Sequence, residues 1–313
     1  MSVIETHELA KTYDTIAAVD GVSMTVEKGE LFCLVGPDGA GKSTVIRILC
    51  GIIPPTGGSA TVLGFDSQKQ KTEVVKKIGY LSQKFSLYGD LTVDENIEFF
   101  ARIHRVEDFT KRREELLEFT RMTDARTRLA ERLSGGMKQK LALACTLIHS
   151  PEVIFLDEPT TGVDPVSRRD FWKILSNLLH QGITIFMTTP YLDEAERCSR
   201  VAMMNHGKLL DIDTPQNIRA KLLGEVYEII CSPVRKAYQI AKGWDDIQEV
   251  QLYGDRLNVI VKQSGRKIEA ILEELKSRDI AVTNWRKIPA SLENVFVSMM
   301  GKGKEIESIP LEH

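Results

Sequence analysis

The sequence has no apolar run that approaches the roughly 20 residues a helix needs to cross a bilayer. Its first residues, MSVIETHELAK, also lack the basic segment followed by an apolar stretch that marks a secretory leader. It contains no internal repeat and no low-complexity tract. These absences argue against a membrane-spanning, secreted or repetitive protein, and any role at a membrane is expected to depend on a partner.

Paired cysteines and a strong charge of either sign are missing too. The five cysteines stand without paired spacing at positions 33, 50, 145, 198 and 231. An odd, unpatterned set, mostly with apolar neighbours, predicts buried thiols in a reducing compartment rather than disulfides or a metal site. The net charge of -3 gives no reason to expect a nucleic-acid partner.

What is present is typical of a globular protein of two domains, with 313 residues, 42% of them hydrophobic and 27% charged. Continuous apolar runs at Leu31–Val35, Val153–Pro159 and Ile183–Thr189 alternate with helical patterns, which predicts a parallel sheet and an α/β fold. Residues 1–30 instead alternate apolar and polar positions. They predict short antiparallel strands with turns at Asp20-Gly21 and Lys28-Gly29.

The composition changes after residue 222, which predicts a domain boundary. The first domain is expected at 1–222, with a mostly helical subdomain at about 84–150. The segment 226–300 has the pattern strand, helix, strand, strand, helix, strand, the order of a small ferredoxin-like α+β domain. In the tail, 301–313, the last residues Leu-Glu-His look like the start of an expression tag, so the native C-terminus is expected to lie elsewhere.

The stretch GPDGAGKST, Gly36 to Thr44, organises the chain. It stands between a predicted buried strand and a predicted helix, the context of a phosphate loop. The glycines let several backbone N–H groups point at one phosphate chain, and the helix adds its N-terminal dipole. Lys42 supplies a charge for the β- and γ-phosphates, and the Ser43 hydroxyl can bind Mg²⁺. The alternative is a glycine-rich turn with a chance Lys-Ser pair.

Two further motifs follow in a fixed order. LSGGMKQ, Leu133 to Gln139, precedes a helix, and Asp157 and Glu158 close the second apolar run. Taken alone, LSGGMKQ also fits a helix-capping loop with Ser134 as the cap. In this order, after the phosphate loop, residues 1 to about 222 resemble the ATP-binding-cassette (ABC) ATPases, which implies a P-loop NTPase fold that binds ATP and Mg²⁺.

The resemblance implies that two such domains dimerise head to tail, with each ATP between the phosphate loop of one and the signature motif of the other. It also implies roles for single residues. Asp157 holds Mg²⁺ through water, and Glu158 is the general base. Gln83 matches the Q-loop, with an ordinary loop glutamine as the alternative.

Tyr13 matches the aromatic residue that stacks on adenine, and Asp164 matches the D-loop. The full expected set for ATP is Tyr13, Gly36, Pro37, Asp38, Gly39, Ala40, Gly41, Lys42, Ser43, Thr44, Gln83, Ser134, Gly135, Gly136 and Asp164. The expected Mg²⁺ ligands are Ser43, Gln83 and Asp157.

One position departs from the family pattern. The family has a histidine at the end of the third apolar strand, in contact with the γ-phosphate, and this chain has Pro190 there. Proline can neither donate a hydrogen bond nor carry charge. Hydrolysis at this chain's own phosphate loop is therefore in question, whereas ATP binding is not.

Within the family, DEAERC, SLENVFV and the C-terminal domain resemble drug and ABC-2 type exporters, and several motifs look closest to the N-terminal cassette of tandem bacterial exporters. We therefore expect an efflux ATPase at the cytoplasmic face of the inner membrane. It would dimerise with a second cassette (homodimer, heterodimer or tandem) and dock on ABC-2 permease subunits through Phe85, Leu87 and Tyr88. Two alternatives remain: a nucleotide-gated clamp with a degenerate site, and a soluble non-transport ABC ATPase.

Overall fold

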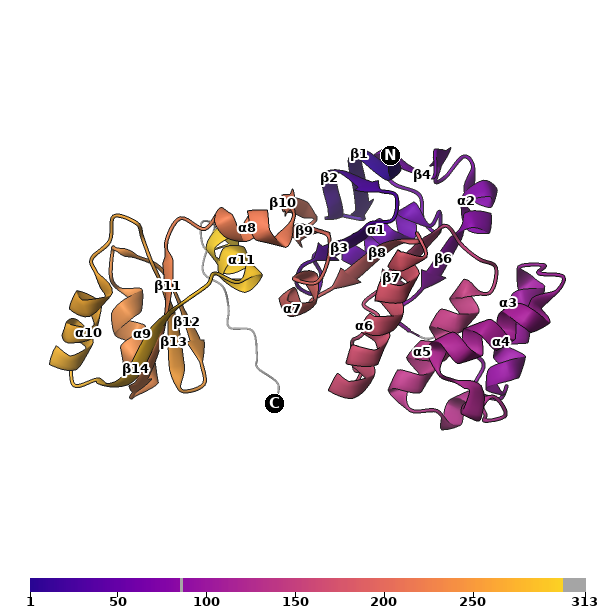
Figure 1. The fold of residues 1–313 in the computed structure, drawn as a ribbon. Helices are drawn as coiled ribbons and strands as arrows, with labels where there is room; N and C mark the ends of the chain where they lie inside the picture. The colour runs from indigo at the N-terminus through magenta and orange to yellow at the C-terminus, as the bar shows by residue number, and fades with distance from the viewer. Residues whose placement is uncertain (85–86, 301–313) are drawn as a thin grey trace. The chain divides into compact units, whose positions relative to one another are not determined.

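The computed structural model describes residues 1–84 and 87–300, in two compact units that divide between Asp213 and Thr214 (Figure 1). The sequence places this boundary later, after residue 222. The difference is α8, Pro215–Ala220, which is capped by Thr214 and packs against α11, Leu292–Met300, of the second unit. Phe85, one of the residues expected to dock a permease, and the tail 301–313 lie outside the described residues.

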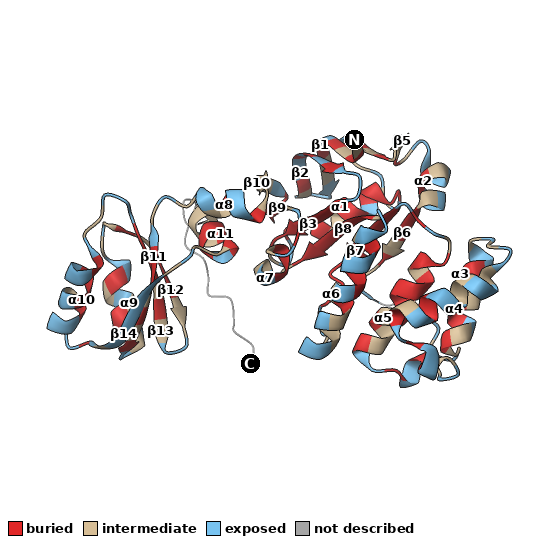
Figure 2. Cartoon of the chain, viewed as in Figure 1, coloured by how far each residue is buried: buried red, intermediate tan, exposed pale blue. Residues whose placement is uncertain are grey.

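The first unit is built on a six-stranded sheet in the order β10-β9-β3-β8-β7-β6. The strands are β3 Leu31–Val35, β6 Ile78–Leu81, β7 Val153–Asp157, β8 Thr184–Thr189, β9 Arg200–Asn205 and β10 Lys208–Asp213. All neighbours are parallel except β10, which is antiparallel to β9. Every residue of β3, β7 and β8 is buried (Figure 2), as expected for parallel strands covered on both faces. The predicted parallel sheet is confirmed.

A second sheet in this unit is antiparallel, in the order β2-β1-β4-β5. Its strands are β1 Ser2–Tyr13, β2 Ile16–Glu27, β4 Gly57–Val62 and β5 Phe65–Asp66. The turn at Lys28-Gly29 is present, but the one predicted at Asp20-Gly21 is wrong, because β2 continues through it. Gly21 has a φ of 68° within the strand, and the β1–β2 pairing shifts register opposite it, between Leu9 and Lys11. The Asp-Gly pair therefore marks an irregularity in a long strand.

Helices cover the parallel sheet and form a lobe beside it (Figure 1). They are α1 Lys42–Leu49, α2 Lys71–Lys77, α3 Val93–Ile103, α4 Phe109–Thr120, α5 Gly135–Leu147, α6 Pro165–His180 and the short α7 Leu192–Ala195. Thr92 and Glu95 form a capping box that starts α3. Helix α3 packs on α4 and α5, and this three-helix lobe lies within the range predicted for a helical subdomain.

The second unit has a four-stranded antiparallel sheet in the order β12-β13-β11-β14. Besides α8 and α11, its elements are β11 Glu225–Ser232, α9 Val234–Lys242, β12 Ile247–Tyr253, β13 Arg256–Val261, α10 Ile268–Ser277 and β14 Ala281–Ile288. From β11 to β14 their order is the strand, helix, strand, strand, helix, strand pattern of the sequence. Apolar residues of α9 and α10, such as Ala237 and Leu275, pack with the sheet in one core. Among the described residues of the whole chain, we find no helix that could cross a bilayer.

Candidate active site

The carboxyl ends of β3, β7 and β8 meet at one edge of the parallel sheet, and the phosphate loop lies between β3 and α1. Its backbone lies against neighbouring strands. A Cβ on Gly36 would stand 2.1 Å from the Met204 carbonyl oxygen, and one on Gly41 would stand 2.1 Å from that of Ala18. Gly41 also has a φ of 103° as the N-cap of α1. Glycine is therefore required at both positions by space, and at Gly41 by conformation as well.

Lys42 starts α1 and is almost fully buried. Its Nζ donates to the carbonyl oxygens of Gly36 at 2.8 Å and Pro37 at 3.0 Å, and lies 3.2 Å from Glu158 Oε1. A buried ammonium group needs such partners because an unpaired charge is costly away from water. The side chain thus lies across the concave side of its own loop, where a phosphate chain would offer stronger, charged acceptors.

Asp157, the last residue of β7, is fully buried. Its Oδ1 accepts hydrogen bonds from Ser43 Oγ at 2.9 Å and Thr188 Oγ1 at 2.8 Å, while its Oδ2 is buried without a hydrogen-bond partner. A carboxylate oxygen of this kind next to a hydroxyl suits a small divalent cation that keeps several of its waters. The structure therefore brings together Ser43 and Asp157, two of the three expected metal ligands, with donor chemistry that fits Mg²⁺.

Glu158 follows Asp157 directly, and both its backbone N–H and its carboxylate are hydrogen-bonded. Its N–H donates to the Thr188 carbonyl at 3.2 Å and lies 3.1 Å from Thr188 Oγ1, and its Oε2 accepts from Gln83 Nε2 at 2.9 Å. Its φ is 48°, which is unusual for a residue with a side chain and persists only where the surroundings impose it. Gln83, expected near the metal, thus contacts the expected base.

Four of the other expected residues, Ser134, Gly135, Gly136 and Asp164, form a second cluster. Ser134 is the N-cap of α5 and accepts from the Met137 N–H, as the capping interpretation of this motif predicts. A Cβ on Gly136 would stand 2.2 Å from Ser167 Oγ, in the first turn of α6, and Asp164 is the N-cap of that helix. Ser134 and Gly135 are exposed at the start of α5, as a surface that meets another molecule requires.

Tyr13 and Pro190 stand at strand ends. Tyr13 closes β1 and is 44% exposed, and Lys11 Nζ lies 5.2 Å from its ring centroid. Pro190 follows Thr189, the last residue of β8, whose carbonyl accepts the Gly36 N–H at 3.4 Å. The position expected for a histidine therefore adjoins the phosphate loop, but its side chain offers no donor.

The sequence did not single out the threonines at the end of β8. Thr188 contacts both Asp157 and Glu158, and Thr189 donates to the buried Glu194. Two polar residues that close an apolar run, as in ITIFMTT, are a signal that could have drawn attention to them. Glu194, in the short helix α7, gave no such signal.

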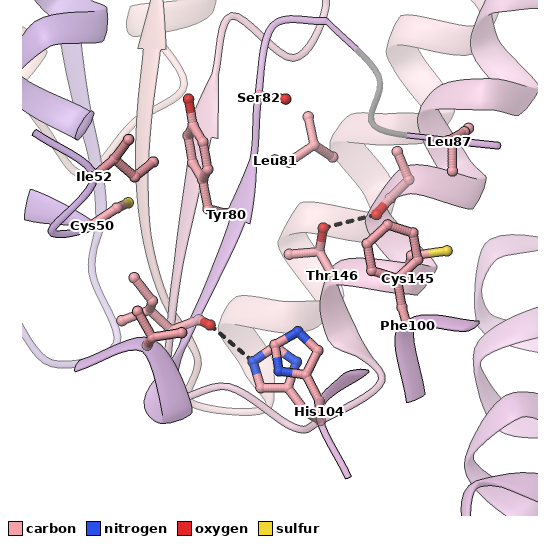
Figure 3. Close-up of a pocket in the computed structure, with 14 residues that line it drawn as sticks. Cys50, Ile52, Tyr80, Leu81, Ser82, Leu87, Phe100, His104, Cys145 and Thr146 are labelled. Atoms are coloured by element: carbon pink, nitrogen blue, oxygen red, sulfur yellow. Dashed lines mark hydrogen bonds between the residues drawn. The ribbon is translucent and has the colours of Figure 1, made fainter. Parts of the chain in front are cut away.

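A separate cavity of about 250 Å³ lies between β6, α3 and α5 (Figure 3). Its lining is mostly apolar and includes Leu81, Leu87 and Phe100. The rings of His104 and His149 stack there with centroids 3.8 Å apart, and His149 Nε2 lies 2.8 Å from the Ile78 carbonyl oxygen. Burial, and then the nearby His104, lower the pKa of His149 to about 4, so this imidazole is neutral at pH 7. The cavity lies beside the loop that follows Gln83.

A doubly covered parallel sheet with a phosphate loop between β3 and α1, and with Asp157 and Glu158 at the end of β7 on the other side of β8, defines a P-loop ATPase. Comparison with known proteins is more specific. Residues 19–161 match the family described as ABC transporter. The Nod factor export ATP-binding protein I of Rhizobium etli is 34% identical over 97% of this chain and 95% of its own length. The chain belongs to the ABC transporter family and carries its ATP-binding ATPase domain.

Two other similarities bear on the assembly. The probable multidrug ABC transporter ATP-binding protein YbhF of Escherichia coli is 42% identical over 70% of this chain, and the match spans only 38% of YbhF. Among solved structures, the dimeric structure of MJ0796, a bacterial ABC transporter cassette, is 26% identical over 67% of this chain and 98% of its own, with a TM-score of 0.62.

Proposed function

We propose that this chain is the ATP-hydrolysing subunit of a bacterial efflux transporter and works with ABC-2 type permease subunits. The observation that carries the proposal is the cluster of Lys42, Ser43, Gln83, Asp157 and Glu158 at one edge of the parallel sheet. The names of YbhF and of the Rhizobium protein support export as the task, because one refers to multidrug transport and the other to Nod factor export. These differ in cargo, so we propose no substrate.

In this proposal the phosphate loop binds the phosphates of ATP through its backbone N–H groups and Lys42. Mg²⁺ bound near Ser43 and Asp157 would neutralise phosphate charge. Glu158 accepts a proton from the attacking water, and Gln83 orients the Glu158 carboxylate through its amide. Lys42, now 3.2 Å from Glu158, exchanges this contact for the phosphates, which leaves the base free to act.

We further propose that Ser134, Gly135 and Gly136 bind the γ-phosphate of an ATP held by a second cassette. Their separation into a cluster of their own, and the dimer seen for the related cassette, support this arrangement. Asp164 beside that cluster would link the two sites of the dimer. The 226–300 segment, with its split βαβ order, is assigned as a ferredoxin-like accessory domain.

For permease docking we propose the cavity of Figure 3 together with the exposed Tyr88, whose ring packs on Phe99 with centroids 4.5 Å apart. Leu87 lines this cavity and follows Gln83 closely in sequence, so a docked permease segment could act on the site through Gln83. The chain would then be peripheral, at the cytoplasmic face of the inner membrane.

A second candidate function is a nucleotide-gated clamp that binds ATP but hydrolyses it poorly, and Pro190 favours it. It differs from the transport ATPase in turnover rather than in binding.

The test is recovery of the full chain from membranes, identification of the co-purified permease, and steady-state ATP hydrolysis with and without it. We expect co-purification and faster hydrolysis in the complex. Leu87→Asp should prevent co-purification while basal hydrolysis continues. Its matched control is Leu210→Asp, at a partly exposed leucine of β10 on the far side of the sheet order. Binding of ATP without turnover in the complex would support the clamp, and recovery without any permease would contradict the transport proposal.

A further inference from the structure

The side chain of Glu194, in α7, is a carboxylate that the proposed chemistry does not use, although it is only 1% exposed. Its Oε1 accepts from Thr160 Oγ1 at 2.6 Å and from Arg168 Nη2 at 2.7 Å, and its Oε2 accepts from Thr189 Oγ1 at 2.7 Å. Both oxygens are therefore bonded. A buried carboxylate is costly, and an apolar side chain of similar size would often serve stability as well.

The three partners come from the three segments that border the candidate active site. Thr160 lies two residues after Glu158, and Thr189 closes β8, where its carbonyl also accepts the Gly36 N–H of the phosphate loop. Arg168 lies in the first turns of α6, the helix that Asp164 caps. The Glu194 carboxylate thus connects three segments by hydrogen bonds: the residues after Glu158, the end of β8 before Pro190, and helix α6, which Asp164 caps.

We propose that Glu194 is a positioning residue for ATP hydrolysis, which holds the Glu158 segment in its productive geometry without touching the nucleotide. Glu158 has a φ of 48°, so its conformation must be imposed from both sides. On one side its N–H is bound to Thr188 of β8. On the other side the Thr160–Glu194 hydrogen bond anchors the chain just beyond it. Without that hydrogen bond, the Glu158 carboxylate is no longer fixed in the position that proton transfer requires.

The inference rests on the proposed function, because it assigns Glu194 to the turnover step of that same site. The gentlest test is Thr160→Val, which removes one hydroxyl and keeps the side-chain shape. We expect kcat to fall by about 10-fold with KM for ATP changed less than about twofold, since a misplaced base slows chemistry without weakening ground-state binding. The matched control is Thr120→Val in α4, where a fully buried threonine donates to the Leu116 carbonyl at 2.7 Å.

A double-mutant cycle assigns the effect to Glu194. Glu194→Leu removes every acceptor at similar volume, and Arg168 retains Asp193, whose Oδ2 is 3.6 Å from its Nη2. In the Glu194→Leu background, Thr160→Val should change kcat less than about twofold, because the two substitutions break one network. Additive effects would overturn the inference, as would a loss of kcat no larger than that of Thr120→Val at equal thermal stability.

Backbone hydrogen exchange of the full chain supplies a readout that does not need turnover. Thr160→Val should speed exchange in residues 158–164 and leave residues 116–122 as in the parent chain, and unchanged exchange in 158–164 would overturn the inference. Wild-type chain that hydrolyses no ATP with its permease would instead defeat the proposed transport function. The exchange experiment would still decide the role of Glu194 in holding the segment.

Discussion

The two units of the chain differ in whether they bury charged side chains. In the described part of the first unit, Lys42, Asp157, Glu158 and Glu194 are buried and gather where the parallel strands end. Glu30 is also buried, but it precedes β3 and lies 3.4 Å from Arg200. Among the residues of the second unit that the structure describes, the buried polar side chains are the uncharged Gln251 and Asn294, and Asn294 Nδ2 donates to Gln251 Oε1 at 2.8 Å.

The ion pairs in the described part of the second unit stay in contact with solvent instead. Arg286 Nε is 2.8 Å from Glu228 Oε1, for example, and the Arg286 side chain is 66% exposed while that of Glu228 is 12% exposed. Charges are costly to bury, so they remain inside a fold where their neighbours compensate them, and they cluster where chemistry needs them. The comparison teaches that the first unit contains the reaction and that the second owes its structure to an apolar core with a charged surface.

The largest expected effect tests the apolar half of this comparison. Leu275→Ala in α10 leaves a hole in the core of the second unit, where Leu275 is fully buried. We expect it to lower the free energy of unfolding of that unit by about 2–5 kcal/mol, because both the transfer energy and packing are lost. Urea unfolding followed by hydrogen exchange in residues 226–300 measures the loss.

Leu223→Ala is the matched control, since Leu223 is 67% exposed and its truncation should cost less than about 0.5 kcal/mol. ATP affinity should be unchanged in both variants. Weaker ATP binding by the Leu275→Ala chain would contradict the view that the first unit binds ATP independently of the core of the second.

The next effect tests the charged half. Glu158→Gln keeps the size of the side chain but removes the base, so turnover should fall by about 10²-fold or more while ATP affinity is kept. Lys42→Ala provides the contrast. Its ammonium meets the phosphates in the ground state too, so we expect ATP binding itself to weaken by about 10-fold or more. Turnover and equilibrium binding of a labelled nucleotide separate the two, and unchanged turnover in Glu158→Gln would remove Glu158 as the base.

The sequence predicted the elements of this site that depend on local pattern. Buried strands are recognisable in the sequence as apolar runs, and the phosphate loop is recognisable by its spaced glycines. The structure explains two of these glycines, because a Cβ on Gly36 or Gly41 would collide with the Met204 or Ala18 carbonyl. The turn expected at Asp20-Gly21 failed for the opposite reason. Asp-Gly has strong local turn preference, but pairing of β2 along the whole of β1 overrides it and turns the glycine into an irregularity.

The Glu194 network lay beyond sequence reasoning because its hydrogen bonds cross the fold. Thr160 lies 34 residues from Glu194, and Arg168 lies 26 residues from it. Only the packing of α7 on β8, together with the approach of α6 through Arg168, brings them together. The contact of Gln83 with Glu158, 75 residues away, likewise depends on the parallel sheet. A motif can name Gln83 but cannot tell which neighbour its amide binds.

The smallest effect concerns Pro190, which follows the end of β8 at the edge of the site. Pro190→His should place an imidazole donor next to the phosphate loop, since Thr189 before it is fixed both by Glu194 and by the Gly36 N–H. We expect turnover to rise by about 10-fold or less, because one added hydrogen-bond donor stabilises charge that develops on the phosphate. Pro190→Ala is the control, as it removes the proline ring and adds no side-chain donor.

The size of the gain depends on how the cassettes pair. In a homodimer both composite sites lack the histidine, and both should gain from Pro190→His. In a heterodimer or tandem pair only the site built on this chain's phosphate loop would gain, while the other would combine the partner's phosphate loop with this chain's Ser134 to Gly136. Site-resolved trapping of nucleotide in the wild-type and Pro190→His complexes distinguishes these. If the wild-type chain alone turns over ATP at ordinary cassette rates and Pro190→His adds nothing, the missing donor is not what limits this site, and the charged cluster around Glu158 suffices without it.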